Sequence, residues 1–592
     1  MGSSRQFFYQ KVLTVLIRSV HSQILLAPIP AVFSHLQFLR CANMSSRSIP
    51  EPRAIIIGCG VAGIVLSARL KTQLGFNNFV VFEREQSIGG TWYLNTYPGV
   101  GCDVDSHLYS FSFNLNPDWS KRFAEQGEIL SYLNDTVDKF GIRPHVTTGV
   151  EVIGANWNEK KWVWQVELRT LETGHTFIRE AEILVSCVGT ISIPADINIP
   201  NHENFNGTIW HSARWNHKYD LKGKTVAVIG NGCSAAQLVP HVVKEAAKVF
   251  QFQRSAQWIN DRPNSNFSTL QKFCFRYIPL YNKLYRFWLW KKTDGLHTLY
   301  QSETQASVRA RSEATQVAKD YMKRMAPAKY HDILIPKFPL GCKRRIFDPG
   351  YLEVLHSENI ELTTEPIVEF TETGVRTSQR DIDIDVAIMS TGFKIQEFLS
   401  PIKITGRQNI TLNEHWNNTQ GAQAYKATFV SGFPNFGIVF GPNAFPAHNS
   451  VIYTNEVQVE FLIKSMFRPI LRGDFAVIDV KQAAENVDVN QVQSKLKSMV
   501  WSSGCANWNL DKSGRNTTNY PEETWRFWYS LYWPVWKDFN IYGDKGSRPW
   551  HPVWKVFGGV TAAGIIAQVL LASGKFGQAG LEKAMELVKG IR

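Results

Sequence analysis

Cysteine is scarce in this 592-residue chain, and the cysteines present have none of the spacings that define metal cages or redox pairs. The eight thiols are scattered singly, and no two form a C-x-x-C motif. This absence argues against a zinc site and against a thiol–disulfide relay, so we predict no metal centre. The small number and wide spread of the thiols favour a reducing compartment, and we expect a cytoplasmic protein.

Acidic residues are absent from residues 1–50, although the whole chain holds 51 Asp and Glu against 64 Lys and Arg. Such a basic segment has the composition of a mitochondrial presequence, but Pro28 and Pro30 interrupt any helix in it. We therefore expect a dispensable extension. Nowhere in the sequence does a basic run alternate with aromatic residues, which argues against a nucleic-acid partner.

Charged residues are also absent from 556–574, which follows a tryptophan-rich region and is bracketed by Lys555 and Lys575. A bilayer core requires roughly 20 apolar residues, so this segment has nearly the length to span one. Its glycine, serine and glutamine residues are as typical of a buried or interfacial helix, so both membrane association and a soluble role stay open.

A glycine-rich loop near residue 60 has the setting of a dinucleotide-binding site. Residues 54–57 form an apolar run typical of a buried parallel strand, and helical spacing follows the loop. Within Gly58-Cys-Gly-Val-Ala-Gly63, Gly58 permits a tight turn, Gly60 lets the backbone approach a pyrophosphate, and Gly63 allows close helix–strand contact. The next strand ends at Glu83, whose carboxylate can accept both ribose hydroxyls of an adenosine.

A second loop of the same kind follows the predicted strand 225–229. Alanine replaces its third glycine, a change small enough to keep the helix near the sheet. The strand after it ends in Arg254 instead of an acid, and a guanidinium offers a planar fork to a 2′-phosphate, which favours NADPH over NADH. The alternative is that Arg254 is a solvated surface charge. The predicted contacts are Gly230, Asn231, Gly232, Cys233, Ser234, Ala235, Gln253 and Arg254.

The segment 205–215 joins the two loops and has the pattern F-x-G-x-x-x-H-x-x-x-W. Its fixed positions are Phe205, Gly207, His211 and Trp215. Two nucleotide loops joined by this linker resemble the flavoprotein monooxygenases of the Baeyer–Villiger type, and the resemblance covers the larger part of the chain. In that family the linker lets two cofactors meet, although Asn216 stands where the family commonly has proline or aspartate.

The resemblance implies an α/β fold with two Rossmann-like dinucleotide-binding domains. Residues 51–200 and 386–500 would bind FAD, and residues 201–385 would bind NADPH. A helical insertion at about 264–339 would cover the substrate, and a tryptophan-rich extension would occupy 501–592. Six aromatic residues of the insertion would give that site an apolar lining, or they are ordinary packing residues; they are Tyr277, Tyr281, Tyr285, Phe287, Trp288 and Trp290.

A segment after the first loop resembles the flavin-cradling stretch of the family. The residues it assigns to FAD are Thr91, Trp92, Tyr93, Leu94, Cys102, Asp103, Val104 and Tyr109, beside Gly58, Gly60, Gly63 and Glu83. One departure is Gly101, because the family commonly has arginine before its Cys-Asp pair. In a later flavin-contacting stretch, His448 would either approach the substrate or cap the following helix.

The same resemblance implies that Arg344 is the catalytic residue and that Asp103 orients it. A guanidinium that never loses its proton can stabilise a peroxide anion and the negatively charged adduct that follows, without acting as an acid. Arg345 is the alternative if the register differs by one residue. The alternative to a catalytic role is that Lys343, Arg344 and Arg345 are three basic residues at the surface.

The function implied is an FAD- and NADPH-dependent Baeyer–Villiger monooxygenase that converts a ketone and dioxygen into an ester or lactone through a C4a-peroxyflavin. The segment 342–353 resembles the corresponding segment of fungal enzymes from sterigmatocystin- and aflatoxin-type pathways. This resemblance implies a bulky polyketide or terpenoid ketone as the substrate. The alternatives are a flavin-dependent hydroxylase of nitrogen or sulfur and a flavin-binding accessory protein without turnover.

Overall fold

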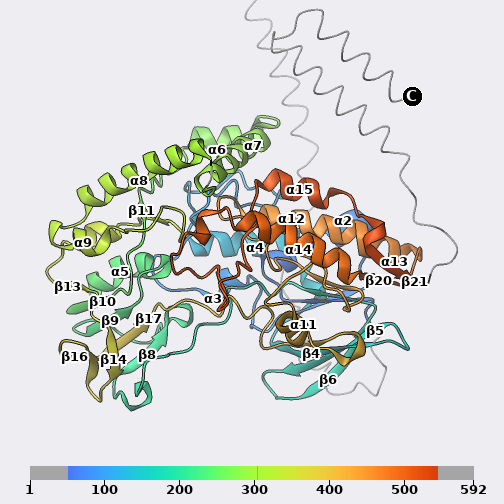
Figure 1. Ribbon diagram of the computed structural model, residues 1–592, viewed down its shortest axis with the longest axis horizontal. Helices are drawn as coiled ribbons and strands as arrows, with labels where there is room; N and C mark the ends of the chain where they lie inside the picture. Colours follow the sequence, from blue (N-terminus) through green and yellow to red (C-terminus); the bar gives the residue numbers. More distant parts are fainter. Residues whose placement is uncertain (1–50, 303, 544–592) are drawn as a thin grey trace, which may run out of the picture. The chain divides into compact units, whose positions relative to one another are not determined.

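Two parallel sheets, each flanked by helices, carry the two glycine-rich loops (Figure 1). The computed structural model describes residues 51–302 and 304–543. The first sheet has the strand order β19-β7-β1-β2-β3 and the second has the order β13-β10-β9-β17-β8. In both sheets the glycine-rich loop leaves a central strand, as the α/β prediction requires.

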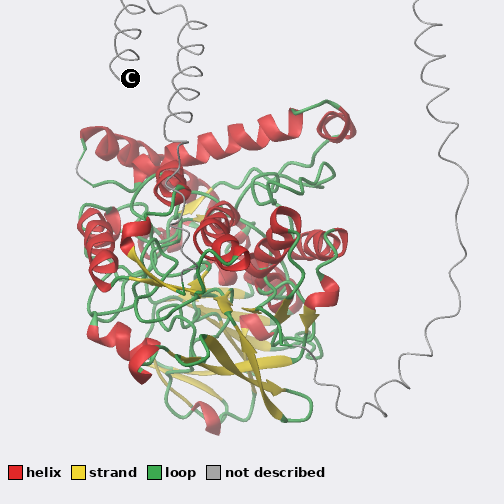
Figure 2. Ribbon diagram, turned by 90° about the vertical axis from the view of Figure 1, so that its right-hand side faces the viewer, coloured by secondary structure: helices red, strands yellow, loops and turns green. Residues whose placement is uncertain are grey.

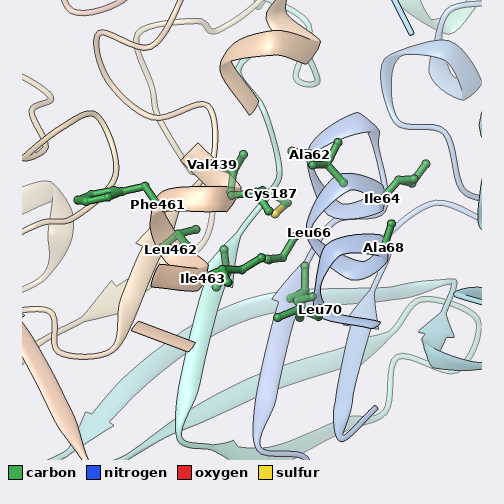
Figure 3. Close-up of a cluster of buried hydrophobic side chains, with 14 of the residues drawn as sticks. Ala62, Ile64, Leu66, Ala68, Leu70, Cys187, Val439, Phe461, Leu462 and Ile463 are labelled. Atoms are coloured by element: carbon green, nitrogen blue, oxygen red, sulfur yellow. The ribbon is translucent and has the colours of Figure 1, made fainter. Parts of the chain in front are cut away.

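The first sheet consists of β1 (Ala54–Ile57), β2 (Phe79–Phe82), β3 (Val146–Thr147), β7 (Ile183–Ser186) and β19 (Phe436–Ile438). All four residues of β1 are buried, which explains its uninterrupted apolar run. Helices α2 (Val61–Leu74) and α12 (Val451–Leu462) pack together beside this sheet. Figure 3 shows buried side chains of α2, among them Leu66, beside Leu462 and Ile463 at the end of α12.

The second sheet consists of β8 (Thr208–His211), β9 (Thr225–Ile229), β10 (Lys248–Phe252), β13 (Ile360–Thr363) and β17 (Val386–Met389), and α5 (Cys233–Glu245) follows β9. Strand β17 pairs in parallel with both β9 and β8. The predicted return to the flavin domain at residue 386 is therefore wrong, because the apolar side chains of β17 complete the core of the second sheet.

Two smaller units of mostly antiparallel strands and several further helices surround these sheets. One unit contains β4 (Val150–Asn158), β5 (Val163–Thr170), β6 (Thr176–Ala181) and β18 (Lys403–Thr405), and the other contains β14 (Ile367–Phe370), β15 (Gly374–Thr377) and β16 (Asp381–Asp383). The further helices and strands are α3 (Thr91–Leu94), α4 (Gln126–Lys139), β11 (Ile259–Asn260), β12 (Ile346–Phe347), α10 (Tyr351–Val354), α11 (Leu412–Asn418), α13 (Arg468–Arg472) and α14 (Gln482–Leu496).

A helical insertion separates β11 from β12. Its helices are α6 (Thr269–Tyr277), α7 (Tyr281–Asp294), α8 (Gln305–Met325) and α9 (His331–Leu334). Helices α6 and α7 lie along the top edge of the fold in Figure 1, and Figure 2 shows this edge turned by 90°, whereas Met322 of α8 and Leu334 of α9 join the core of the second sheet. The predicted aromatic lining is wrong for most of its members, because Tyr277, Tyr281, Phe287 and Trp288 face solvent. The sequence shows the aromatic residues of the insertion but not which of them the fold covers.

The described part of the predicted C-terminal extension belongs to the flavin-side core. Helix α15 (Thr524–Tyr532) packs on α12, and β21 (Phe539–Tyr542) pairs antiparallel with β20 (Val477–Val480). Residues 501–543 therefore do not form a separate extension. The segment 556–574 lies outside the described residues, and within them no helix is long and apolar enough to cross a bilayer.

A disulfide joins Cys342 to Cys505 across 163 residues of sequence. The scattered spacing of the cysteines gave no sign of this pair, because residues so far apart meet only through the fold. From the sequence we expected a reducing compartment, and that expectation did not include a disulfide. It fastens the loop before β12 to the segment that follows α14.

The contact between β1 and α2 yields a first prediction. A Cβ added at Gly63 would lie 2.1 Å from the carbonyl oxygen of Gly58, so Gly63→Ala must push the helix from the strand. Such overpacking typically costs about 1–3 kcal/mol, and a clash with backbone belongs at the upper end. We expect a lowered Tm in thermal unfolding. Gly127→Ala in α4 is the control, because a Cβ there meets nothing within 4 Å; equal Tm values for the two variants would contradict the prediction.

Candidate active site

A cavity of about 250 Å³ lies beside the first glycine-rich loop. Most of the residues expected to contact a flavin nucleotide line it, namely Gly58, Gly60, Glu83, Thr91, Trp92, Leu94 and Tyr109. Trp92 Nε1 donates a hydrogen bond of 3.0 Å to the Tyr109 hydroxyl, so these two side chains brace one wall. Tyr93, Cys102 and Val104 lie outside the lining.

Glu83 is fixed at the wall of this cavity, at the end of β2. Its Oε2 accepts from the Cys59 N–H at 2.7 Å, and its Oε1 accepts from the Glu85 N–H at 3.0 Å. Burial raises the pKa of the Glu83 carboxyl, and the two backbone N–H groups act in the opposite direction without cancelling the effect. The carboxyl is therefore held in one orientation, with its remaining lone pairs available to a ligand in the cavity.

The first loop fits a dinucleotide because its backbone is accessible. Gly60 and Gly90 approach so closely that a Cβ on Gly90 would lie 2.9 Å from the Gly60 Cα. No side chain caps the N-terminus of α2, so its first backbone N–H groups remain free for an anion. A pyrophosphate is the part of a flavin dinucleotide that such a helix end would hold.

Two further loops complete the cavity, and neither carries a motif from which its role could be predicted. One is 188–193, which follows β7, and the other is 394–402, which follows β17. Both leave the carboxyl ends of parallel strands, where loops of α/β folds commonly gather around ligands. Their contribution depends on the topology and not on residue type.

The second loop also leaves space for a ligand. A Cβ on Gly230 would lie 2.3 Å from the Ser390 carbonyl oxygen, so this turn requires glycine, whereas a Cβ on Gly232 would meet nothing within 4 Å. Gly232 is the N-cap residue of α5, and no side chain caps that helix. The Asn231 side chain donates to the Gln253 side chain at 3.1 Å, which ties the loop to the end of β10. Ala235, in the first turn of α5, is fully buried.

Two cations lie at the end of β10. Arg254 is exposed there, and Lys343 approaches from the loop before β12, where its Nζ donates to the Ser255 Oγ at 2.7 Å. Burial and the nearby Arg254 charge both lower the pKa of the Lys343 ammonium. Lys343 was missed as a site residue, because adjacency to Arg344 in sequence does not reveal that it points toward the other loop.

Arg344 and Asp103 form an ion pair between the two domains. Nε and Nη2 of Arg344 donate to Oδ2 of Asp103 at 3.0 and 2.5 Å. The guanidinium also lies 5.6 Å from the centre of the Phe445 ring, which lines the first cavity. Burial alone would lower the pKa of Arg344, but the Asp103 carboxylate and the Cys233 thiol of the second loop raise it above its usual range. A permanent positive charge thus lies between the two nucleotide loops.

Neighbours of this pair clarify three expectations. Arg345 does not contact Asp103 and instead lies over the Phe347 ring at 5.8 Å. Beside Gly101, Nη2 of Arg262 donates to the Cys102 carbonyl at 2.8 Å, so an arginine from elsewhere in the chain occupies this position. His448 does not cap a helix, because its buried Nε2 lies 3.1 Å from Asp294 Oδ1 and Ser450 caps α12.

The linker between the loops forms the edge of the second sheet. Phe205 is buried, with its ring 5.5 Å from Phe370, and a Cβ on Gly207 would clash with the Asp385 carbonyl. His211 Nδ1 accepts from the Ala213 N–H at 3.1 Å, and the Trp215 ring packs edge-on against Trp210. The two domains also contact each other directly, because the Tyr97 hydroxyl donates to Ser234 Oγ of α5 at 3.3 Å.

Comparison with known proteins agrees with this geometry. Residues 51–271 match the family described as flavin-binding monooxygenase-like. A Baeyer–Villiger monooxygenase of Pseudomonas aeruginosa is 34% identical over 509 residues, covering 82% of this chain and 93% of that protein. The FAD-binding monooxygenase ktnD of Aspergillus niger is 31% identical over 526 residues, covering 85% of this chain and 84% of that protein.

The fold is likewise shared with solved structures. A cyclohexanone monooxygenase from Rhodococcus bound to NADP⁺ matches with a TM-score of 0.72 at 25% identity, covering 83% of this chain and 98% of that one. An oxidized steroid monooxygenase bound to NADP matches with a TM-score of 0.71, also at 25% identity, covering 83% of this chain and 99% of that one. The chain belongs to the flavin-binding monooxygenase family, and Baeyer–Villiger monooxygenases are among its relatives.

The open space at Gly232 gives a prediction for the second loop. Gly232→Ala adds a methyl group that touches no protein atom, so we expect an unchanged Tm. The methyl group would stand where a pyrophosphate approaches the backbone, and a misfit of about 1–3 kcal/mol corresponds to roughly a 5- to 150-fold rise in KM for NADPH. Steady-state NADPH oxidation measures this. An unchanged KM would show that no pyrophosphate lies against Gly232.

Proposed function

We propose that this protein is an FAD- and NADPH-dependent Baeyer–Villiger monooxygenase, which inserts one oxygen atom of dioxygen beside a ketone carbonyl to give an ester or lactone. The observation that carries this proposal is the Asp103–Arg344 pair, which lies between two loops suited to dinucleotides. Relatives that bear this activity in their names, at 34% identity over most of the chain, support it.

In this proposal the first loop, with Glu83 at the cavity wall, holds FAD, and the second loop holds NADPH. Gly60 and Gly232 leave room for the two pyrophosphates. Trp92 and Tyr109 brace the wall on which the flavin would rest. When bound, the nicotinamide supplies a hydride and the reduced flavin activates dioxygen. The linker 205–215, at the edge of the second sheet, then sets the distance between the two nucleotides.

Arg344 would stabilise the negative charge that develops on oxygen as the ketone carbonyl is attacked. Its raised pKa keeps the guanidinium protonated throughout, so it lends charge and never a proton. Asp103 holds two of its nitrogens in place, so the charge needs no reorganisation during the reaction. Hydroxylation of nitrogen or sulfur needs a protonated oxidant, and a group that cannot donate its proton does not favour that chemistry.

Preference for NADPH would rest on Arg254 together with Lys343. The two cations lie at the end of β10, where the adenosine ribose of a nucleotide on the second loop would be placed. A 2′-phosphate would neutralise both charges and relieve their mutual repulsion. NADH lacks this phosphate and would gain nothing from either side chain.

For the substrate we favour a bulky polyketide or terpenoid ketone. The segment Cys342-Lys-Arg-Arg-Ile-Phe-Asp348 supports this choice, because it resembles the matching segment of fungal secondary-metabolism enzymes. The similarity to FAD-binding monooxygenases of Aspergillus niger and Aspergillus terreus is in keeping with it. Accumulation of one carbonyl compound after deletion of the gene would identify the substrate.

The arginine assignment is tested by Arg344→Ala. We expect retained FAD and an unchanged fold, with ester or lactone formation reduced on the order of 10²–10³-fold, because one preorganised charge is lost. Arg344→Lys should recover little, because an ammonium lacks the planar fork and can release its proton. Product formed per NADPH consumed is the measurement, with flavin absorbance recorded in parallel.

The adjacent Arg345→Ala is the matched control, since Arg345 lies over Phe347 and not against Asp103. It should retain activity within a few-fold. If Arg344→Ala oxygenates its ketone with wild-type coupling, the Baeyer–Villiger proposal is wrong. If wild-type protein binds FAD but never oxidises NADPH, the accessory alternative holds instead.

The lowered pKa of Lys343 predicts a pH-dependent choice of nucleotide. Only the protonated ammonium attracts a 2′-phosphate, so the preference for NADPH over NADH is greatest below this pKa and declines as the pH rises through it. The decline should begin at a lower pH than for an ordinary lysine, whose pKa is about 10.4. The ratio of KM values for the two nucleotides between about pH 7 and pH 10 measures this. Lys343→Arg should abolish the pH dependence, and a persisting dependence would assign it to another group.

A further inference from the structure

The outward sides of three helices carry large apolar side chains that remain exposed. Most of the exposed large hydrophobic residues of the described chain lie on or beside α6, α7 and α15. Leu284 is 62% exposed, Trp288 52% and Tyr529 68%. We call this surface the aromatic face and define it by Phe273, Tyr277, Leu284, Trp288, Trp528 and Tyr529.

The spacing of these residues shows that the aromatic face is not a part of the core left open. Phe273 and Tyr277 are four residues apart on α6, and Leu284 and Trp288 are four apart on α7, so each pair lies on one side of its helix. Other residues supply the buried sides, namely Phe275, Leu289 and Phe527. Each helix therefore has one apolar side that is buried in the protein and a second apolar side that is exposed.

Contacts between α7 and α15 hold the face together. Trp290 Nε1 donates to Thr524 Oγ1 at 3.1 Å, and Asp294 Oδ1 accepts from the Thr524 N–H at 2.8 Å. Both helices rest on α12, where the Tyr453 ring lies 5.7 Å from that of Trp290. Figure 1 draws α6, α7 and α15 along one edge of the fold. Helices α7 and α15 are therefore neighbours, and each carries apolar side chains that are exposed.

Positive charge without acidic partners borders the face. Lys283, Lys291 and Lys292 of α7 are exposed, and no residue of the described chain forms an ion pair with them. Lys292 Nζ lies 5.1 Å from the Trp288 ring. The acid of α7, Asp294, is buried and bonded to His448, so it does not balance these charges.

We propose that the aromatic face binds the surface of a lipid bilayer that contains anionic lipids. Tryptophan and tyrosine favour the interfacial region, and lysine stems can lie along apolar surface while their ammonium groups reach lipid phosphates. Anionic lipid contributes about 1 kcal/mol for each lysine near the surface. This docking is independent of the proposed reaction and uses none of its residues.

Charge distinguishes a bilayer from two other occupants. A second copy of the chain docked by the same face would oppose lysine to lysine, which is unfavourable. The uncharged segment 556–574 would cover the apolar side chains but leave the lysines unpaired. An anionic surface satisfies both the apolar stripes and the border of positive charge.

The test uses the full-length protein and vesicle co-sedimentation. Wild-type protein should pellet with vesicles of phosphatidylcholine and phosphatidylserine, less with phosphatidylcholine alone, and less again as salt is raised. Leu284→Ser/Trp288→Ser removes two exposed apolar side chains of the face and should weaken binding by about tenfold or more. Ile178→Ser is the matched control, because Ile178 is 62% exposed on β6, outside the face.

Further variants separate the contributions. Lys283→Gln/Lys291→Gln should lose the preference for anionic vesicles and keep weak binding to neutral ones. Flavin content and NADPH oxidation without vesicles should stay at wild-type levels in every variant. Trp528→Ser/Tyr529→Ser on α15 serves as the second test if the α7 variant does not fold.

Three outcomes would overturn the proposal. The first is wild-type protein that stays in the supernatant with both vesicle types. The second is wild-type binding by the serine variants, which would assign membrane attachment to another segment such as 556–574. The third is a wild-type dimer that the serine variants dissociate, which would make the face a contact between protein chains.

Discussion

The ion pair between Asp103 and Arg344 is the interaction on which the site depends, because its partners come from different domains. Asp103 follows the first loop and Arg344 precedes β12, so the pair forms only when both halves are folded and docked. The side chains are 27% and 31% exposed, so the pair is partly buried, and the cost of removing both charges from water offsets much of their attraction. Its importance is positional, since it places one fixed charge between Phe445 at the first cavity and Cys233 at the second loop.

The parts that could be predicted are those in which a local requirement of the backbone selects the residue type. Gly58, Gly63 and Gly230 occupy turns or contacts that leave no room for a side chain, so both loops and their flanking strands were visible in the sequence. The predicted family is confirmed by relatives at more than 30% identity. The roles of individual site residues stay predictions, although the structure brings Arg344 and Asp103 together.

What could not be predicted depends on partners distant in sequence. The strand at Val386–Met389 was expected, but its sheet was not, because an apolar run does not reveal its neighbour. The same limit applies to Lys343, whose direction follows from the loop that carries it, and to the cavity walls at 188–193 and 394–402. The aromatic residues of α7 were visible in the sequence, but which of them are exposed depends on how the helix packs.

The bond between Cys342 and Cys505 changes the covalent connectivity of the molecule. With this bond the backbone from 342 to 505 becomes a closed ring, which contains β17, α12 and α14 and therefore parts of both halves. A single peptide cleavage anywhere inside the ring opens it without releasing a fragment. The segment that bears the arginine is thus attached to the flavin side by the backbone in both directions and, in addition, directly through sulfur.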